Sequence, residues 1–117
     1  MEMSTSPIEN ENEEVLTFLP PHLRQSAVFL GRELAWRTED ALRVIGCLAL
    51  RSWAVVGVQL MDQVEGAPLW IMSSDYRVDK GLGREAYVVS CAENAKLFIQ
   101  EFSVTSESLF LLVWNQP

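Results

Sequence analysis

The side chains that most often perform chemistry are few in this chain and lie far apart. The single histidine, His22, follows two prolines at the start of a predicted helix, away from any acid or nucleophile pattern. A histidine base needs an orienting acid and a nucleophile nearby, and a zinc site needs several His or Cys ligands at short spacing. We therefore expect an exposed histidine at a helix start, and neither a bound metal nor a cofactor.

A second candidate for chemistry is the glycine-rich segment Gly81-Leu82-Gly83-Arg84, which precedes a predicted helix. Backbone N–H groups at a helix start can bind phosphate, but the Gly-x-Gly-x-x-Gly spacing and the Gly-Lys-Ser/Thr ending are both absent. Asp75 and Asp79 precede this segment without the twelve-residue ligand spacing of a calcium loop. The glycines are typical of a flexible helix entry, and we predict that the chain is not an enzyme.

The two cysteines, Cys47 and Cys91, are too far apart in sequence for a zinc motif and too few for a disulfide framework. Both lie on predicted helices. Cys91 falls on an apolar face and is expected to be a small buried side chain, whereas Cys47 lies nearer the rim and is expected to be more exposed.

Charge is concentrated at the N-terminus of this 117-residue chain, whose net charge is −7. Five of its sixteen acidic residues lie in the first fourteen positions, which contain no lysine or arginine. We predict a disordered acidic tail over residues 1–14 and a single domain over residues 15–117. The tail is either a solvated segment or an arm that attracts a basic partner. The absence of a basic patch argues against nucleic-acid binding.

Neither a membrane span nor a secretory signal is predicted. No apolar run reaches the roughly 18–20 residues that cross a bilayer. The first fourteen residues contain neither a basic n-region nor an apolar h-region. We expect a cytoplasmic protein that does not bind membranes.

The strongest structural pattern lies between Glu85 and Asn115. Apolar residues at steps of three and four predict a helix over Glu85–Phe102, and Ser108–Asn115 is predicted to be a buried strand. The buried face of the helix is expected to contain Val88, Cys91, Ala92, Ala95, Phe98, Ile99 and Phe102.

The remaining elements follow from similar patterns. Apolar steps of four and three predict a first helix from Pro21 to about Glu33, and Thr38 is a plausible N-cap for a second. Trp53–Met61 is rich in β-branched and aromatic residues, which predicts an interior strand with a bulge or close approach at Gly57. A turn over Asp62–Pro68 and a strand over Leu69–Ser73 complete an antiparallel hairpin.

The predicted order is therefore α-α-β-β-α-β, in the α+β class. A small, mainly antiparallel sheet of about three strands would have two to three helices packed against it. Trp53 and Trp114 are expected in the core, and Trp36 is expected to attach the second helix to the sheet. Trp70, on the returning strand at the expected sheet edge, is either a core residue or an exposed anchor for a partner.

These landmarks resemble one family when taken in order. Leu34-Ala35-Trp36 precedes a helix with Ala41-Leu42 and Ile45, and Val55-Val56-Gly57-Val58 and Trp70 follow. Tyr87-Val88-Val89-Ser90 then leads into Ala95-Lys96-Leu97-Phe98-Ile99 and a final apolar strand. From about Leu34 to Trp114, this order resembles the immunity protein 40 family of bacterial polymorphic toxin systems. The chain departs from the pattern in having one glycine, Gly57, where a Gly-Gly pair is expected, and in its acidic N-terminal extension.

The resemblance implies a protein that binds and neutralises a cognate protein toxin in the cell that makes it. Shape and charge complementarity would achieve this without catalytic groups. The matching residues are apolar and do not locate the binding surface. We predict that this surface combines aromatic anchors with acids that face a basic toxin: Asp62, Glu65, Trp70, Asp75, Tyr76 and Asp79.

Two other functions remain open. The chain could be a structural or assembly subunit that self-associates as a homodimer through an exposed edge strand at Leu109–Trp114. It could also be a small hydrolase or ligand-binding domain, which requires a closed pocket where His22 meets an acid and Ser90 or Cys91.

Overall fold

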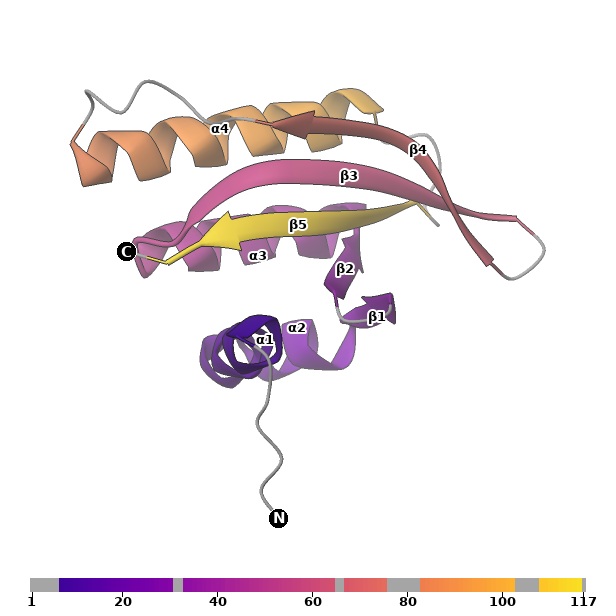
Figure 1. Cartoon of the computed structure of the whole chain (residues 1–117), viewed down its shortest axis with the longest axis horizontal. Helices are drawn as coiled ribbons and strands as arrows, with labels where there is room; N and C mark the ends of the chain where they lie inside the picture. The colour runs from indigo at the N-terminus through magenta and orange to yellow at the C-terminus, as the bar shows by residue number, and fades with distance from the viewer. Residues whose placement is uncertain (1–6, 31–32, 65–66, 76–82, 103–107, 117) are drawn as a thin grey trace, which may run out of the picture.

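The computed structural model describes the backbone of residues 7–30, 33–64, 67–75, 83–102 and 108–116, and the side chains of residues 12–30, 33–61, 83–102 and 108–116. Helices and strands alternate in groups along these residues (Figure 1). In chain order they are α1 (Pro7–Phe18), α2 (Pro21–Gln25), β1 (Val28–Leu30), β2 (Glu33–Arg37), α3 (Thr38–Leu50), β3 (Ala54–Val64), β4 (Ala67–Asp75), α4 (Arg84–Phe102) and β5 (Leu109–Asn115).

The strands form one antiparallel sheet in the order β1-β2-β5-β3-β4. The α+β class is therefore confirmed, as is the antiparallel β3–β4 hairpin. The described sheet has five strands rather than about three, because β1 and β2 add a second hairpin. β5 lies between β2 and β3, so the expectation that Leu109–Trp114 forms an exposed edge was wrong. The edges of the described sheet are β1 and β4.

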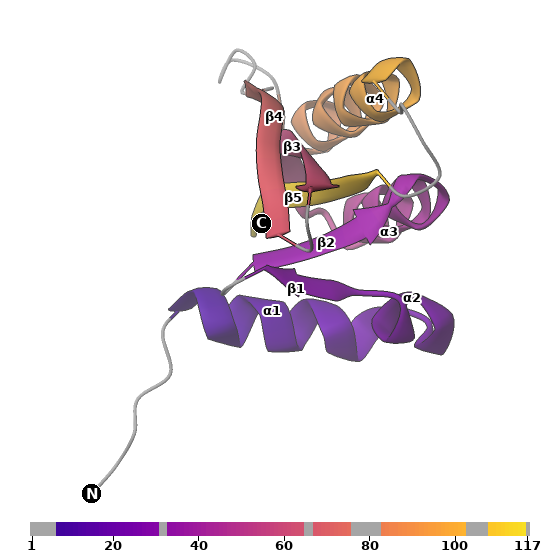
Figure 2. The same ribbon diagram turned by 90° about the vertical axis from the view of Figure 1, so that its right-hand side faces the viewer.

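All four described helices contribute side chains to one face of this sheet. The main core joins Leu34 and Trp36 of β2, Phe110 and Leu112 of β5, and Val58 and Leu60 of β3 to apolar residues of every helix. Figure 2 shows α3 and α4 together on one side of the strands. On the other face, strand residues form a smaller buried cluster: Ala35, Met61, Leu109 and Leu111. No helix in the described residues is both long and apolar enough to cross a membrane.

The unit formed by α4 and β5 agrees with the sequence pattern. Six of the seven expected residues of α4 are buried, and Phe102 packs against the core while partly exposed. The ring of Phe98 contacts that of Phe110 edge to face, with centroids 6.5 Å apart. The three-and-four spacing therefore identified the face of α4 that packs against the sheet.

A β-bulge interrupts β3 near Gly57, as the glycine predicted. Val55 pairs with Trp114 and Gly57 with Val113, so Val56 is an extra residue that has no pairing partner on β5. Val56 is buried with Ala54 and with α4 residues in a small cluster separate from the main core. The bulge thus lets β3 contact both the main core and the first turns of α4.

The expected acidic tail is only partly correct. Residues 1–6 lie outside the described residues, but residues 7–14 belong to helix α1 rather than to a disordered segment. Asn12, Val15 and Leu19 are buried, while Glu13 and Glu14 are exposed. Their helical spacing places the buried residues on one face, so α1 packs on the core while its glutamates stay in water.

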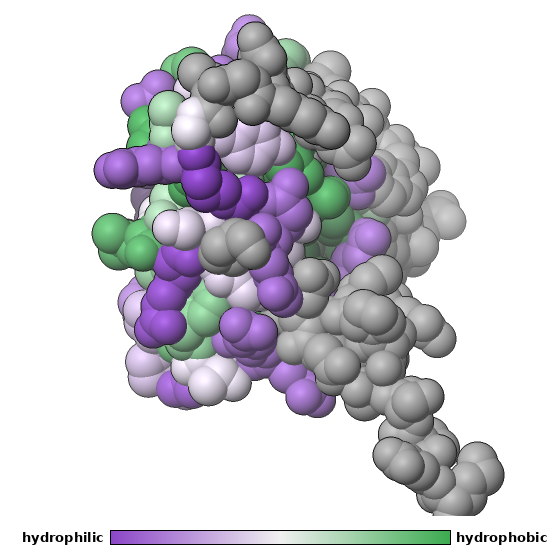
Figure 3. Space-filling view, turned by 60° about the vertical axis from the view of Figure 1, so that its left-hand side comes forward, coloured by the Kyte–Doolittle hydropathy of each residue, from purple (hydrophilic) through white to green (hydrophobic). Residues whose placement is uncertain are grey.

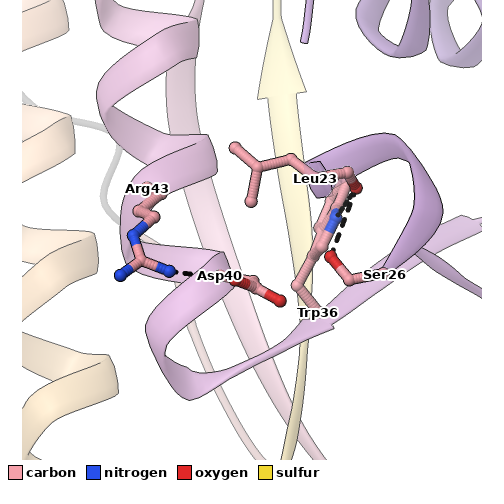
Figure 4. A network of polar contacts seen from close by, with 5 residues as sticks. All are labelled: Leu23, Ser26, Trp36, Asp40 and Arg43. Carbon is pink, nitrogen blue, oxygen red and sulfur yellow. Dashed lines mark hydrogen bonds and ion pairs between the residues drawn. The ribbon is translucent and has the colours of Figure 1, made fainter. Parts of the chain in front are cut away.

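The predicted helix over Pro21–Glu33 is also corrected. Helix α2 ends at Gln25, and the β1–β2 hairpin follows it. Leu34, Ala35 and Trp36 are all buried, because β2 contributes to the clusters on both faces of the sheet. Trp36 lies within β2, and its indole Nε1 donates a hydrogen bond to the carbonyl of Leu23, 2.8 Å away (Figure 4). This bond attaches α2 to the sheet, and Trp36 also lies in the same core cluster as residues of α3, the helix that it was expected to attach.

Helix α3 begins at Thr38 with Arg37 at the N-cap position, one residue before the predicted cap. It ends in a Schellman motif. Trp53 N–H donates to the Leu48 carbonyl at 2.9 Å, and Ser52 N–H donates to the Ala49 carbonyl at 3.0 Å. Ser52 occupies the left-handed region, with φ 63°, where glycine is usually found at this position.

Replacing Ser52 with glycine should therefore stabilise the protein. A non-glycine residue in the left-handed conformation costs about 1–2 kcal/mol, part of which the larger entropy of unfolded glycine offsets. We expect the free energy of unfolding to rise by roughly 0.5–1 kcal/mol in urea denaturation. Ser52→Ala keeps the Cβ, and with it the cost of the left-handed backbone conformation, so it serves as the matched control. Equal stabilities of the glycine and alanine variants would contradict the prediction.

Candidate interaction surface

The chemically capable residues are not assembled into a common site. His22 is exposed on α2, whereas Cys91 of α4 is buried among Ala54, Val56 and Val88. In Figures 1 and 2, α3 lies between α2 and α4. The pocket required by the hydrolase alternative, with His22 beside Ser90 or Cys91, is therefore not formed by these residues. Cys47 is partly exposed, as expected from its place at the rim of α3.

Two further predictions concern metal and phosphate. Among the described residues, no group of three or more His, Cys, Asp or Glu side chains is placed to hold a metal ion. Asp79, Gly81 and Leu82 lie outside the described residues, and the side chain of Asp75 is not described. Gly83 is exposed and leads into α4, as expected for a helix entry.

The guanidinium of Arg84 has a structural role at this helix start. Its Nη2 donates to the carbonyl of Ser52 at 2.8 Å, to the carbonyl of Asn115 at 3.3 Å and to the Asn115 side-chain Oδ1 at 3.1 Å. Nε adds a second bond to Ser52, at 3.3 Å. Arg84 therefore joins the start of α4 to the end of α3 and the end of β5. These bonds direct the guanidinium towards acceptor oxygens of the protein's own chain.

The predicted toxin-binding residues lie on or beside the β3–β4 hairpin. Glu65, Tyr76 and Asp79 fall outside the described residues; Asp62, Trp70 and Asp75 are described only by their backbone. Trp70 lies opposite Met61, on the edge strand β4 as predicted. Asp62 lies opposite Leu69, and Asp75 six positions farther along β4. At about 3.3 Å per residue, the two acids lie near opposite ends of the hairpin, roughly 20 Å apart.

The other tryptophans are placed largely as expected. Trp53 is buried, and its ring makes edge contacts with those of Phe18 and Trp114, with centroids 5.8 Å and 6.4 Å away. Trp114 packs against the main core while partly exposed. Both residues therefore stabilise the fold. Trp70 is the tryptophan that remains a candidate for binding a partner.

A second surface, which the sequence analysis did not single out, lies on the outer side of α4. Glu85, Val89, Glu93, Leu97 and Glu101 recur at steps of four, and all five are exposed. Val89 is 48% exposed and Leu97 60% exposed. We refer to these five residues as the α4 row. The signal was present in the sequence as a repeat of acid and apolar residues, opposite the face that predicts the core.

Exposed apolar side chains also occur at the end of the molecule where α3 ends and α4 begins. Leu50, the last residue of α3, is 88% exposed. Figure 3 shows hydrophobic side chains standing between hydrophilic ones on this end, rather than merging into one broad apolar area. This end therefore offers isolated apolar contacts, whereas the α4 row repeats them at regular spacing.

One buried polar group stands apart from both surfaces. Among the described side chains, the Oε1 atom of Gln59 is buried without a hydrogen-bond partner. Gln59 lies on β3 between Leu111 of β5 and Ser73 of β4. An unpaired buried acceptor destabilises a fold, since its bond to water is lost without replacement.

Comparison with known proteins identified no relatives. No protein-family model, curated protein or solved structure matches the chain.

Proposed function

We propose that this chain is an immunity protein that binds and neutralises a cognate bacterial toxin in the cytoplasm of the cell that makes both. The supporting observation is the ordered set of residues resembling the immunity protein 40 family. Leu34-Ala35-Trp36 lies in β2, Ala41 and Ile45 in α3, and Val55–Val58 in β3, all buried. The pattern continues through α4 into β5. Most of the residues that carry the resemblance thus lie in the buried clusters, whereas Val89 and Leu97 are exposed on α4.

Inhibition of this kind depends on the exterior of the fold. A net charge of −7 favours encounter with a basic protein, because complementary charge raises the association rate. Exposed apolar side chains between acids, as in the α4 row, supply area that can be buried on contact. These features suit a basic protein toxin as partner.

The decisive experiment uses the toxin itself. The proposal requires a gene for a large secreted protein beside the gene for this chain, and the C-terminal domain of that protein is the probe. Expression of that domain alone should arrest growth of a bacterial host, and co-expression of this chain should restore growth. Isothermal titration calorimetry with the purified pair should give a one-to-one complex.

Two outcomes would contradict the proposal. One is the absence of a toxin domain beside the gene. The other is continued growth arrest, together with no measurable binding, when the chain is present in molar excess.

The predicted hairpin surface has its own test. Changing Asp75 and Tyr76 to alanine together should weaken toxin binding at least tenfold, since tyrosine is enriched among interface hot spots and an acid complements a basic partner. The melting temperature should stay nearly unchanged. The matched control is Glu13→Ala with Phe29→Ala, which removes one acid and one aromatic ring from exposed positions on α1 and β1. An unaltered affinity of the Asp75/Tyr76 variant would exclude this surface.

The alternative of a self-associating, non-enzymatic subunit is supported by one observation. β4 is a nine-residue edge strand of the described sheet, and an edge strand of this length can pair with another chain. Sedimentation velocity across a hundredfold concentration range separates the two functions. A concentration-dependent dimer without affinity for the toxin domain would favour the subunit, and a monomer that binds the toxin would exclude it.

A further inference from the structure

The α4 row is formed by the geometry of a single long helix. Residues four apart follow one another along a helix surface and form a ridge slightly inclined to the axis. With a rise of about 1.5 Å per residue, successive members lie about 6 Å apart, and the row from Glu85 to Glu101 is roughly 24 Å long. Its carboxylates therefore recur about every 12 Å, with Val89 and Leu97 between them.

The core does not contain these side chains. The core face of α4 consists of other residues, including Val88, Ala95 and Phe98. Within the part of the chain that the structure describes, neither a hydrogen bond nor an ion pair engages the carboxylates of Glu85, Glu93 or Glu101. Val89 and Leu97 are exposed despite being large and apolar. Three acids without a partner among the described residues and two apolar side chains are thus presented together on one helix.

The charge of this helix face favours one kind of partner. Residues 85–101 contain three glutamates and one lysine, Lys96, which is half-buried beside the row. A second copy of this chain would bring the same acids against each other, and like charges oppose such contact. A surface with lysines or arginines on either side of apolar side chains would pair with the acids and bury Val89 and Leu97.

We propose that the α4 row is the principal docking surface for the toxin, which would present a basic face interspersed with apolar side chains. This inference rests on the proposed immunity function and names the surface that performs it. The carboxylates guide encounter and set the register, and the two apolar side chains slow dissociation. The hairpin residues then form a second, weaker contact.

The test compares charge reversal on and off the row. Glu85, Glu93 and Glu101 are changed together to lysine in one variant. The control variant changes Glu13, Glu14 and Glu33, which are exposed acids on α1 and β2, to lysine. Each Glu→Lys change alters the charge by two, so both variants move the net charge from −7 to −1. The probe is the toxin domain that the proposed function requires, with kinetics measured by surface plasmon resonance.

We expect the row variant to bind at least about 100-fold more weakly, mostly through a slower association, whereas the control loses less than about tenfold. Val89→Ala with Leu97→Ala should raise the dissociation rate about tenfold while the association rate changes little. Because lysine in the first turn of α4 disfavours the helix, the triple Glu→Gln variant provides a second test at smaller charge change. It should bind at least about tenfold more weakly.

The outcomes separate this inference from the proposed function. If the unaltered chain does not bind the toxin domain, the proposed function fails and the docking surface fails with it. If the unaltered chain binds and the row and control variants lose affinity equally, the affinity depends on net charge and not on the position of the acids. The inference is then overturned. Equal affinity of all variants overturns it as well.

Covalent mapping gives an independent check on the unaltered complex. A carbodiimide joins a carboxylate to a lysine amine only when the two are in contact. Cross-links from Glu85, Glu93 or Glu101 to toxin lysines would support the docking surface. Cross-links confined to acids elsewhere in the chain would refute it.

Discussion

Replacing Phe98 with aspartate is expected to prevent folding. Phe98 is 5% exposed, and its ring packs against those of Phe102 and Phe110, with centroids 4.8 Å and 6.5 Å away. Truncating a core phenylalanine costs about 3–5 kcal/mol, and an unpaired buried carboxylate adds several more. That sum is comparable with the total stability of roughly 5–15 kcal/mol for a domain of this size. The far-ultraviolet circular dichroism should show no cooperative transition in urea.

Lys96, two residues earlier on a half-buried part of the same helix, provides the control. Lys96→Glu should change the free energy of unfolding by no more than about 0.5 kcal/mol, as is usual for surface positions. Phe98→Leu keeps the site apolar and should unfold cooperatively with reduced stability. A Phe98→Asp variant with a urea midpoint close to that of the unaltered chain would show that α4 does not pack as described.

Truncation of Trp36 should have the next largest effect. Its side chain is 0% exposed and lies in the main core between the helices and the sheet. Trp36→Ala removes this volume together with the hydrogen bond to the Leu23 carbonyl (Figure 4). We expect a loss of at least about 3–5 kcal/mol in the free energy of unfolding, from the cavity that the indole leaves.

Trp36→Phe separates the hydrogen bond from the packing. The phenyl ring keeps most of the apolar contact but has no N–H, so the Leu23 carbonyl retains only the Ser26 hydroxyl, 3.4 Å away. The loss should be about 1–3 kcal/mol, smaller than for alanine. Equal stability of the phenylalanine variant and the unaltered chain would mean that the bond adds nothing to the attachment of α2.

The elements that the sequence predicted well are those with one buried side or an uninterrupted run of apolar residues. Helix α4 carries apolar residues at regular steps over nineteen positions, and β5 is a short run of apolar residues. Helix α3 begins within one residue of the predicted start. In each case local periodicity and tertiary packing favour the same structure, which is why a single sequence was sufficient.

The N-terminal region was harder because two patterns overlap there. Leu23, Ala27, Leu30 and Leu34 fit a helical spacing, yet the first belongs to α2 and the last two to β1 and β2. β2 is buried on both faces, which removes the alternation that usually identifies a strand. In α1 and the residue that follows it, the many glutamates hid the spacing of Asn12, Val15 and Leu19, which is that of an amphipathic helix.

The candidate surfaces were less predictable than the core. A buried face produces periodic apolar residues, whereas a contact surface depends on what the partner presents and leaves no regular trace in composition. The hairpin residues were chosen for their chemistry alone. The repeat that forms the α4 row is present in the sequence, but the exposure of Val89 and Leu97 became known only when α4 was placed.

The central position of β5 has a consequence for biosynthesis. β2 pairs with β5 through Ala35 and Leu111, so within the sheet the N-terminal hairpin and the β3–β4 hairpin are connected by a strand that leaves the ribosome later than either. Until then, the nascent chain presents two unpaired strand edges, those of β2 and β3, which can associate with other chains. Nascent chains interrupted before residue 109 should therefore depend on chaperones or be degraded, and the sheet should close only when β5 inserts.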